Sequence, residues 1–488
     1  MDVEQIGKLG KELMGFLGQF DDCFGRSEPR EHLQTYVRGQ LSDLRRKSVE
    51  LIALAADVPP RTLQRFLESM RWDEHRMRDR VQWIVARDHA DPRAIGIIDE
   101  TGNPKKGSHT AGVKRQWCGN TGKVDNCVVA VHLAYVAGDF QCVLDSDLFL
   151  PEDWASDPAR RREARVPDDI EYRKKTIIAL EQIGRALRNR IRVAAWTFDE
   201  LYGGDREFLD GLDAMGQNYV GEVPSNFTGW LRPPEVLLRP RPQEKRKLGR
   251  KRRFPRLARK ALPASEARNL LTYSRVFQKQ KWQRFRIKDG ERGPMVWEVK
   301  CVCFYRKHGE RGLPGPAHTL IVARNVLDPE EIKYFVSNMV PGCNGVTLEW
   351  LLWVAFSRWP IERCFEFDKG QLGMDHFEVR LWCAIHRHLY VSQVSQLFCA
   401  RVHQRLTEKN DFERVPHGRT GSRRNLRLDP SPSPAAVGQN HHLPKGSRPH
   451  CLSPTSQSTS ARIPYENDPS TPSETRHRSR ALEVLRTR

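Results

Sequence analysis

Two apolar runs that each end in an aspartate constrain the fold of this chain most. The run "AIGII" leads into Asp99, and the run "VAAWTF" leads into Asp199. Amphipathic helical patterns such as "TIIALEQIGRAL" alternate with these and further apolar runs. Strands that alternate with helices predict a mixed α/β sheet. Because the ends of such strands often border the crevice where α/β proteins bind ligands, both aspartates are candidate site residues.

A third acid lies in the segment "WPIERCFEFDKGQLGMDHFEVRLW", where the pattern predicts a helix. Glu362 and Lys369 are separated by two helical turns, so they lie about 20° apart on a helical wheel. Phe365 and Leu372 fall on the same stripe, which would normally face a core. A carboxylate and an ammonium on such a stripe must be paired or must bind something. The alternative for all three acids is structural, as turn former, helix cap or partner of a helix dipole.

The charge balance favours a polyanionic partner. The 488 residues include 81 basic and 61 acidic side chains, a net charge of +20. Nucleic acids and anionic membranes both attract such an excess. No apolar run approaches the ~18 residues of a membrane span, and the N-terminus lacks the pattern of a secretory signal. The 11 cysteines show no CxxC motif and suit a reducing cytosol. We therefore expect nucleic acid, rather than a membrane, as the partner, and a cytoplasmic location.

Three carboxylates in one place point to metal-dependent chemistry. Such a cluster cannot stay fully ionised without cations. Hard divalent ions such as Mg²⁺ take oxygen ligands and keep waters for substrate phosphates. Two such ions can activate an attacking oxygen and stabilise the leaving one during phosphoryl displacement. In a strongly basic chain, this chemistry suggests cutting or joining of a nucleic-acid backbone.

The first 90 residues read as helical. Within them, "SVELIALAADVPPRTLQRFLESMRW" predicts a helix, a turn and a second helix that starts at a proline. Apolar residues from Leu63 to Met70 repeat with helical spacing, whereas Arg61 and Arg65 face outward. This arrangement fits a DNA-binding helix-turn-helix with a basic surface, and equally an ordinary helical hairpin.

Three blocks of the sequence resemble the signature blocks of bacterial insertion-sequence transposases. They are "IDETGNPKKGSHTAGVKRQWCGNTGKVDNC" (Ile98–Cys127), "TFDELYGGD" (Thr197–Asp205) and "RWPIERCFEFDKGQLGMDHFEVR" (Arg358–Arg380). The similarity is to the DDE group, and within it to the insertion-sequence family numbered seven hundred and one. It covers roughly residues 20 to 403.

The resemblance implies an RNase H-like mixed-sheet catalytic core, interrupted by a β-rich insertion. It also implies Asp99, Asp199 and Glu362 as the catalytic and metal-binding triad, which would hold two Mg²⁺ ions, with Mn²⁺ able to substitute. In the wider superfamily a Tyr, an Arg and a Lys accompany the last acid. Arg358 and Lys369 match the Arg and the Lys as DNA contacts, whereas the Tyr position falls on Ala355.

The resemblance and the changes in composition together predict five regions. They are an N-terminal helical DNA-binding domain (1–90), the first part of an RNase H-like core (91–225), a basic insertion (226–295), the last part of the core with the helix of the catalytic Glu (296–405), and a disordered tail (406–488). The insertion contains the highly basic run Arg239–Lys260. The tail is rich in Ser, Pro and Arg.

Further basic and aromatic residues follow the first acid. Candidates for contact with the DNA backbone are Lys105, Lys106, Lys114 and Arg115, although a solvated basic loop would have the same composition. Trp117 and Trp359 could stack on splayed bases, but packing in a core or hinge is the favoured prediction for both.

The sequence therefore predicts a DNA transposase that binds the terminal inverted repeats of its element, cuts DNA and joins the freed ends to target DNA. A dimer is expected because two ends must be brought together, and the cell location would be the nucleoid of a bacterial cytoplasm. The alternatives are a metal-dependent endonuclease without strand transfer, and an inactive or domesticated DNA-binding relic.

Overall fold

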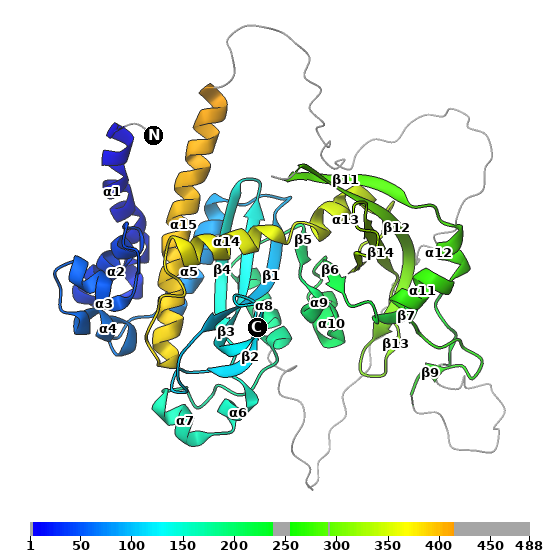
Figure 1. The fold of residues 1–488 in the computed structure, drawn as a ribbon, viewed down its shortest axis with the longest axis horizontal. Coiled ribbons are helices and arrows are strands. Elements are labelled where there is room, and N and C mark those ends of the chain that lie inside the picture. The colour runs from blue at the N-terminus through cyan, green and yellow to red at the C-terminus, as the bar shows by residue number, and fades with distance from the viewer. Residues whose placement is uncertain (1–2, 238–253, 291–292, 414–488) are drawn as a thin grey trace, which may run out of the picture. The chain divides into compact units, whose positions relative to one another are not determined.

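The computed structural model describes residues 3–237, 254–290 and 293–413 (Figure 1). Side chains are described for residues 8–237, 254–287 and 293–407. Most of the basic run Arg239–Lys260 and the predicted tail from residue 414 onward lie outside these ranges, so the predictions for them stay predictions. Among the described helices, none is both long enough and apolar enough to cross a membrane.

The N-terminal part is helical, as its sequence predicts. The predicted turn separates two short helices: Ser48 caps the first by accepting a hydrogen bond from the Leu51 N–H, and Pro60 opens the second. Leu63, Phe66 and Leu67 of the second helix are buried. The helices here are α1 (Val3–Leu17), the 3₁₀ helix η1 (Gly18–Cys23), α2 (Ser27–Gln40), α3 (Val49–Ala55), α4 (Pro60–Glu68) and α5 (Glu74–Asp88).

A first sheet of five strands carries the two candidate aspartates. Its strands are β1 (Ile95–Pro104), β2 (Lys114–Cys118), β3 (Lys123–Ala137), β4 (Phe140–Leu148) and β5 (Ala195–Thr197). Strand β3 is antiparallel to β1, β2 and β4, whereas β5 is parallel to β1. The mixed α/β architecture predicted from the alternation of strands and helices is confirmed.

Helices from distant parts of the chain cover this sheet. Helix α8 (Lys175–Arg188) contacts β3 and β4, α14 (Trp359–Gly370) contacts β1 and β4, and the long α15 (Trp382–Glu413) runs along β4 and also contacts α2, α4 and α5 (Figure 1). The amphipathic pattern of α8 predicts that Ile177, Leu180, Ile183 and Leu187 face inward, and this prediction is only partly right. Ile183 is buried, but the fully buried neighbours include Ile178 rather than Ile177. Helical spacing leaves the rotation of a helix uncertain by one position, and packing decides it.

A second sheet of eight strands combines the predicted insertion and the last part of the core with β6, which comes from the predicted first part of the core. Its longest strand, β12 (Gly293–His308), crosses the predicted boundary at residue 295 and pairs with strands on both sides of it. The other strands of this sheet are β6 (Val220–Val223), β7 (Thr228–Trp230), β10 (Ser265–Glu266), β11 (Gln283–Gly290), β13 (Leu313–Pro314), β14 (His318–Asn325) and β15 (Ile332–Ser337).

Short elements connect these parts. Among them, α9 and α10 follow β5, and α13 leads toward α14 (Figure 1). The remaining elements are α6 (Glu152–Ala155), α7 (Pro158–Glu163), α9 (Glu200–Gly203), α10 (Arg206–Ala214), α11 (Ala267–Tyr273), α12 (Arg275–Lys279), α13 (Leu348–Ala355), β8 (Val236–Leu237) and β9 (Arg256–Leu257).

Candidate active site

The register of two parallel strands brings Asp99 and Asp199 to the same level of the first sheet. Ile97 of β1 is paired with Thr197 of β5, and each acid follows two residues later. Parallel strands advance together, so both acids lie at the same level of the sheet, although Asp99 is inside β1, which continues to Pro104, and Asp199 follows the end of β5. Along β1 successive side chains point to opposite faces. Asp99 therefore faces α14, whereas the next acid, Glu100, faces α8 and accepts a hydrogen bond from the Lys175 ammonium at 2.6 Å.

Asp99 is almost enclosed, with 7% of its surface exposed. Burial raises the pKa of Asp99 to about 7, against the opposing effect of the nearby Arg358 guanidinium. The carboxylates of Asp199 and Glu362 add to the rise in this pKa, because like charges disfavour its ionised form. Both other acids of the predicted triad therefore influence the pKa of Asp99.

Asp199 is the N-cap of the short helix α9, and its carboxylate accepts a hydrogen bond from the Leu201 N–H at 3.0 Å. Burial raises the pKa of Asp199, while Arg358 and the backbone donors of α9 oppose the rise. Gly203 lets α9 approach β6 closely, since a Cβ at that position would lie 1.8 Å from the Glu222 carbonyl oxygen. Asp199 therefore has the structural role of a helix cap, and it also lies within the electrostatic reach of Arg358.

Glu362 lies in the first turn of α14, with 37% of its side chain exposed. Its carboxylate is paired with the Arg358 guanidinium at 2.8 Å, and Arg358 also donates to Asp99 at 2.6 Å. Arg358 is the N-cap residue of this helix, which begins at Trp359 even though the residue before a proline usually avoids helical geometry. One guanidinium thus joins the carboxylate of the first sheet to that of α14.

The charges around Arg358 show that the three acids share one neighbourhood. Burial alone would lower the pKa of Arg358, but Asp99, Glu362 and Asp199 each raise it. Asp99 and Glu362 contact Arg358 directly, whereas Asp199 is linked to it only by this electrostatic effect, with no hydrogen bond or ion pair between them in the described residues. This neighbourhood comes from tertiary structure, because no local pattern links the three acids.

The remaining residues of the predicted stripe of α14 have two kinds of environment. The apolar ones are buried, whereas Lys369 lies near Asp99. Phe365 and Leu372 are buried, although Leu372 lies just beyond the end of the helix. Lys369 donates a hydrogen bond to the Thr101 hydroxyl at 2.6 Å and lies 3.5 Å from the Asn120 side-chain oxygen. Burial lowers the pKa of Lys369. Its ammonium thus lies at the same face of β1 as Asp99.

The further basic candidates differ in how free their charges are. Lys105 is engaged inside the protein: its ammonium donates to the Phe377 carbonyl at 2.8 Å, and burial lowers its pKa to about 8. Lys114 is exposed and paired with Asp153 at 3.0 Å. Lys106 and Arg115 are exposed, and no ion pair joins either of them to another described side chain. Open and engaged cations therefore alternate along this segment.

The two basic candidates of α4 are both exposed. Arg61 is paired with Glu68 at 3.1 Å, whereas Arg65 has no such pair among the described side chains. The helix, turn and second helix are present, but their geometry serves a helical hairpin as well as a helix-turn-helix. Binding of DNA through this surface stays a prediction.

The favoured prediction for the two tryptophans is wrong. Trp117 is 60% exposed and Trp359 is 57% exposed, so neither packs in a core. Trp117 lies in the edge strand β2, which the sequence did not reveal because its short run "KRQWC" mixes charged and apolar residues. Trp359 is the first residue of α14.

A second arginine-centred cluster, missed at the sequence level, lies between α10 and the second sheet. Arg306 of β12 is paired with Asp210 at 2.6 Å and with Asp213 at 2.5 Å. His308 lies 3.5 Å from Asp210, and the oxygens and nitrogen of Asp210, Asp213 and His308 come close enough to share a cation. The buried Arg306 guanidinium already supplies the positive charge between these two carboxylates. The spacing of the two aspartates at i and i+3 was the signal that sequence reasoning passed over.

The donor types around Arg358 suit divalent cations. However, the oxygens of Asp99, Asp199 and Glu362 do not all come close enough to one another to share an ion in this arrangement. All three predicted ligands are carboxylates, the oxygen ligands that Mg²⁺ and Mn²⁺ prefer. The raised pKa of Asp99, caused by burial and by two neighbouring carboxylates, indicates a cluster whose charge a cation would relieve. In the structure, the Arg358 guanidinium takes part of that charge.

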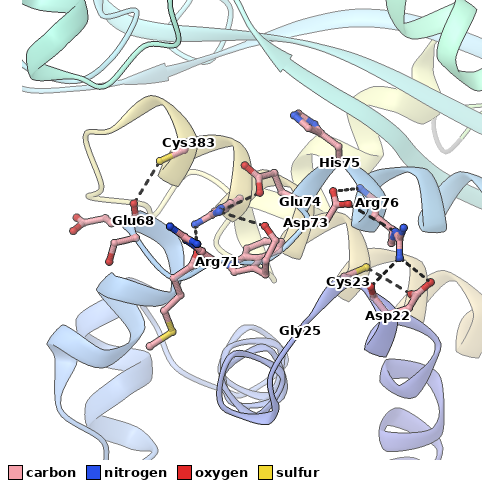
Figure 2. A pocket seen from close by; sticks show the side chains of 14 residues that line it. Asp22, Cys23, Gly25, Glu68, Arg71, Asp73, Glu74, His75, Arg76 and Cys383 are labelled. Atoms are coloured by element: carbon pink, nitrogen blue, oxygen red, sulfur yellow. Dashed lines mark hydrogen bonds and ion pairs between the residues drawn. The ribbon is translucent and has the colours of Figure 1, made fainter.

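A hollow of about 740 Å³ lies elsewhere, among η1, the segment between α4 and α5, and α15. Figure 2 shows its charged side chains paired with one another: Arg76 lies between Asp22 and Asp73. Arg387, which also lines it, is paired with Glu74 at 3.1 Å. The hollow contains none of the three predicted acids.

Comparison with known proteins gives two findings. The sequence model of the DDE superfamily endonucleases matches residues 19–294. Over 191 residues the chain is 33% identical to a curated protein of Microchaete diplosiphon named "Probable transposase for insertion sequence element IS701". The aligned segment covers 38% of this chain and 47% of the relative. The chain thus spans about half the length of this relative.

Proposed function

Because the chain belongs to the DDE superfamily of endonucleases, we propose that it is a DNA transposase with Asp99, Asp199 and Glu362 as its catalytic residues. The observation that supports this proposal is that Arg358 contacts Asp99 of β1 and Glu362 of α14 and lies within electrostatic reach of Asp199 at the start of α9. The similarity to a transposase of an insertion sequence favours transposition over other reactions of this superfamily.

In the proposed reaction the three carboxylates hold two divalent ions. When bound, two Mg²⁺ ions, or Mn²⁺ in their place, would activate water and then a 3′-hydroxyl, and would stabilise the leaving oxygen. The backbone donors of α9 orient Asp199, and the enclosed position of Asp99 excludes bulk water from that carboxylate. Arg358 and Lys369, at the two ends of α14, contact the phosphates that flank the reacting bond.

The proposed architecture assigns one task to each region. The first sheet, with an antiparallel β1–β3–β4 meander and the parallel strand β5, supports the RNase H-like core predicted for residues 91–225 and 296–405. The N-terminal helices, with Arg61 and Arg65, would bind the terminal inverted repeats. The basic insertion, together with Lys106 and Arg115, would add contacts to the DNA backbone. Two copies of the chain would act together to hold two DNA ends.

The direct test is cleavage of the DNA that carries this reading frame with its natural flanks. We expect the purified chain to cut near both ends of the element when Mg²⁺ or Mn²⁺ is present, and not in EDTA. Asp99→Asn, Asp199→Asn and Glu362→Gln should each abolish cutting while binding of the same DNA persists. Binding without cutting by the wild type would instead favour the inactive relic.

A joining assay separates the transposase from an endonuclease without strand transfer. Pre-cut ends with free 3′-hydroxyls are incubated with a supercoiled target plasmid and Mg²⁺. A transposase joins the ends to the plasmid, and the joined product is detected by its slower migration in a gel. Efficient cutting with no joined product would support the endonuclease.

A further inference from the structure

The hairpin formed by β2 and β3 presents an apolar surface to solvent at the edge of the first sheet. Strand β2 pairs on one side with β3 and ends the strand order of that sheet. Trp117 lies directly opposite Val124, and these two side chains are 60% and 53% exposed. Exposed apolar side chains on an edge strand are an aggregation risk that proteins usually avoid. Their presence here indicates a surface that another molecule covers.

The opposite face of the same hairpin is anchored in the protein. Cys118, next to Trp117 in the strand, is fully buried and clusters with Cys127 and Val129. Because side chains alternate along a strand, this packing fixes Trp117 outward. The exposed indole is therefore held on a supported strand, and stacking against a ligand would not require the hairpin to be ordered first.

The charge beside the indole favours a polyanion. Arg115 lies two residues before Trp117 in β2, so both side chains emerge on the same face. Arg115 is exposed and has no ion pair with any other side chain in the described ranges. Together the two residues offer an aromatic plane and a free guanidinium, the combination by which proteins hold unpaired nucleotides through base stacking and phosphate contact.

The turn of the hairpin touches the candidate active site. The Lys369 ammonium lies 3.5 Å from the side-chain oxygen of Asn120 in this turn, and 2.6 Å from the hydroxyl of Thr101. Thr101 lies on the same face of β1 as Asp99. A DNA strand bound at Asp99 and Lys369 would therefore meet the hairpin within a short distance along its length.

We propose that Trp117 stacks against an unpaired base of the DNA strand next to the reacting bond, with Val124 supporting the indole and Arg115 contacting the neighbouring phosphate. This inference rests on the proposed function, since it takes DNA as the ligand of the site. The inference adds to the proposed function a positioning surface that binds unpaired nucleotides at a DNA end. Trp117 does not touch the reacting atoms in this arrangement.

The test compares binding of the full chain to two probes at low salt. One is a blunt DNA duplex, and the other is the same duplex with a short single-stranded tail that carries the fluorescent base 2-aminopurine. We expect wild-type protein to quench the fluorescence and to prefer the tailed duplex. Trp117→Ala should lose the quenching and bind the tailed duplex about 5- to 100-fold more weakly, the value of one stacked base. Binding of the blunt duplex should change less than about threefold.

Matched variants separate stacking from other effects. Trp117→Phe should restore much of the preference for the tailed duplex, because it keeps an aromatic plane. Tyr172→Ala removes an aromatic ring that is 44% exposed in the segment before α8, to which no DNA contact is assigned, and should leave the preference unchanged. The thermal midpoint of Trp117→Ala should match that of the wild type, since the side chain is exposed.

Two results would overturn the inference. One is a Trp117→Ala protein that binds both probes as the wild type does. The other is a variant that changes the oligomeric state of the chain in gel filtration and not the preference between probes, which would assign the surface to a second copy. Both readouts use binding alone. A wild type that never cuts DNA with Mg²⁺ would therefore count against the proposed function and leave the stacking result to be judged separately.

Discussion

Arg358 and Arg306 each pair with two carboxylates, but the two clusters differ in their access to solvent. The Arg306 side chain is 0% exposed, and its guanidinium also contacts the ring of His318 at 3.2 Å. The Arg358 side chain is 30% exposed, and its partner Glu362 is 37% exposed. In the enclosed cluster each aspartate has further hydrogen bonds, from the Gly309 N–H and from the Asn338 side chain.

The comparison teaches how similar charges serve two purposes. The enclosed cluster joins α10 to the second sheet, and its carboxylates already accept hydrogen bonds from protein donors. A ligand could bind there only by displacing the buried Arg306 guanidinium. In the open cluster, Asp99 is nearly enclosed, but solvent, a metal ion or a phosphate can reach the Arg358 guanidinium and the Glu362 carboxylate, which are 30% and 37% exposed. Among the described residues, proximity alone selects the enclosed cluster, because Asp210, Asp213 and His308 are near enough to share a cation, whereas Asp99, Asp199 and Glu362 do not form such a group.

The largest expected effect is on activity at the open cluster. Asp99→Asn, Asp199→Asn or Glu362→Gln should lower the rate of Mg²⁺-dependent DNA cutting by about 1,000-fold or more, because each removes a metal ligand worth several kcal/mol in the transition state. The matched control is Asp210→Asn in the enclosed cluster, which should keep more than about a tenth of the wild-type rate. Equal losses in both clusters would erase the distinction between them.

The second prediction concerns folding stability, for which the enclosed cluster should show the larger effect. Arg306→Met leaves two carboxylates without their buried partner and should destabilise the fold by about 3 kcal/mol. Arg358→Met removes a more exposed pair, so its cost should stay below about 1 kcal/mol. Thermal and urea unfolding of both variants, measured without metal, would check this. A larger loss for Arg358→Met would mean that the open cluster is the structural one.

A pH dependence should distinguish the enclosed cluster. Burial lowers the pKa of His318 to about 4, and Arg306 adds to this lowering, with Asp213, Tyr219 and His308 also facing the ring. From the ordinary pKa of 6.5 down to about 4, the unfolded chain takes up a proton that the folded chain does not. The stability that this neutral ring contributes is therefore present above pH 6.5 and is lost as the pH falls toward 4.

His318→Gln tests this dependence, since it keeps a polar side chain that does not titrate. Its stability should fall less steeply than that of the wild type between pH 6.5 and 4, by at most about 1.4 kcal/mol per pH unit. Urea unfolding across this range gives both slopes. Identical slopes would show that other groups cause the acid sensitivity.

The smallest effect contrasts open and engaged lysines next to the first acid. Lys106→Ala should lower DNA affinity severalfold and reduce the slope of log affinity against log salt by about 0.9, if its ammonium neutralises one phosphate. Lys105→Ala should leave that slope unchanged, because its ammonium is held by backbone carbonyls. Fluorescence anisotropy of a labelled duplex at several salt concentrations measures both. A changed slope for Lys105→Ala would mean that the Lys105 ammonium leaves its backbone carbonyl partners and contacts a phosphate when DNA binds.

Part of the fold followed from the sequence. The helices of the first 90 residues, the strands that lead to Asp99 and Asp199, and the start of α14 were predictable, because apolar periodicity, proline and capping residues act locally. Strand β2 was not, since its pattern mixes charge with apolar residues, and neither was the pairing of β12 with strands on both sides of residue 295. Long-range pairing depends on which edges meet, and no local pattern encodes that.

The candidate site divides in the same way. The types of its residues, and the resemblance that selected Asp99, Asp199 and Glu362, were properties of the sequence. The role of Arg358 as the group that joins them, the withdrawal of Lys105 from solvent and the exposure of Trp117 appeared only when the segments were assembled. The preference for packing at Trp117 failed because Trp117 and its cross-strand neighbour Val124 are on a face of the hairpin that leaves both side chains exposed.

The sequence by itself determined a basic α/β chain of the DDE superfamily, with acids directly after two apolar runs, because composition, periodicity and signature blocks are properties of the chain itself; that Asp99 lies inside β1 rather than at its end was not among these. Only the tertiary structure decided which acids share an arginine, which of the two arginine clusters is open, and which aromatic faces solvent. Burial and charge proximity are properties of the folded arrangement, and residues more than a hundred positions apart acquire them only when the strands and helices pack.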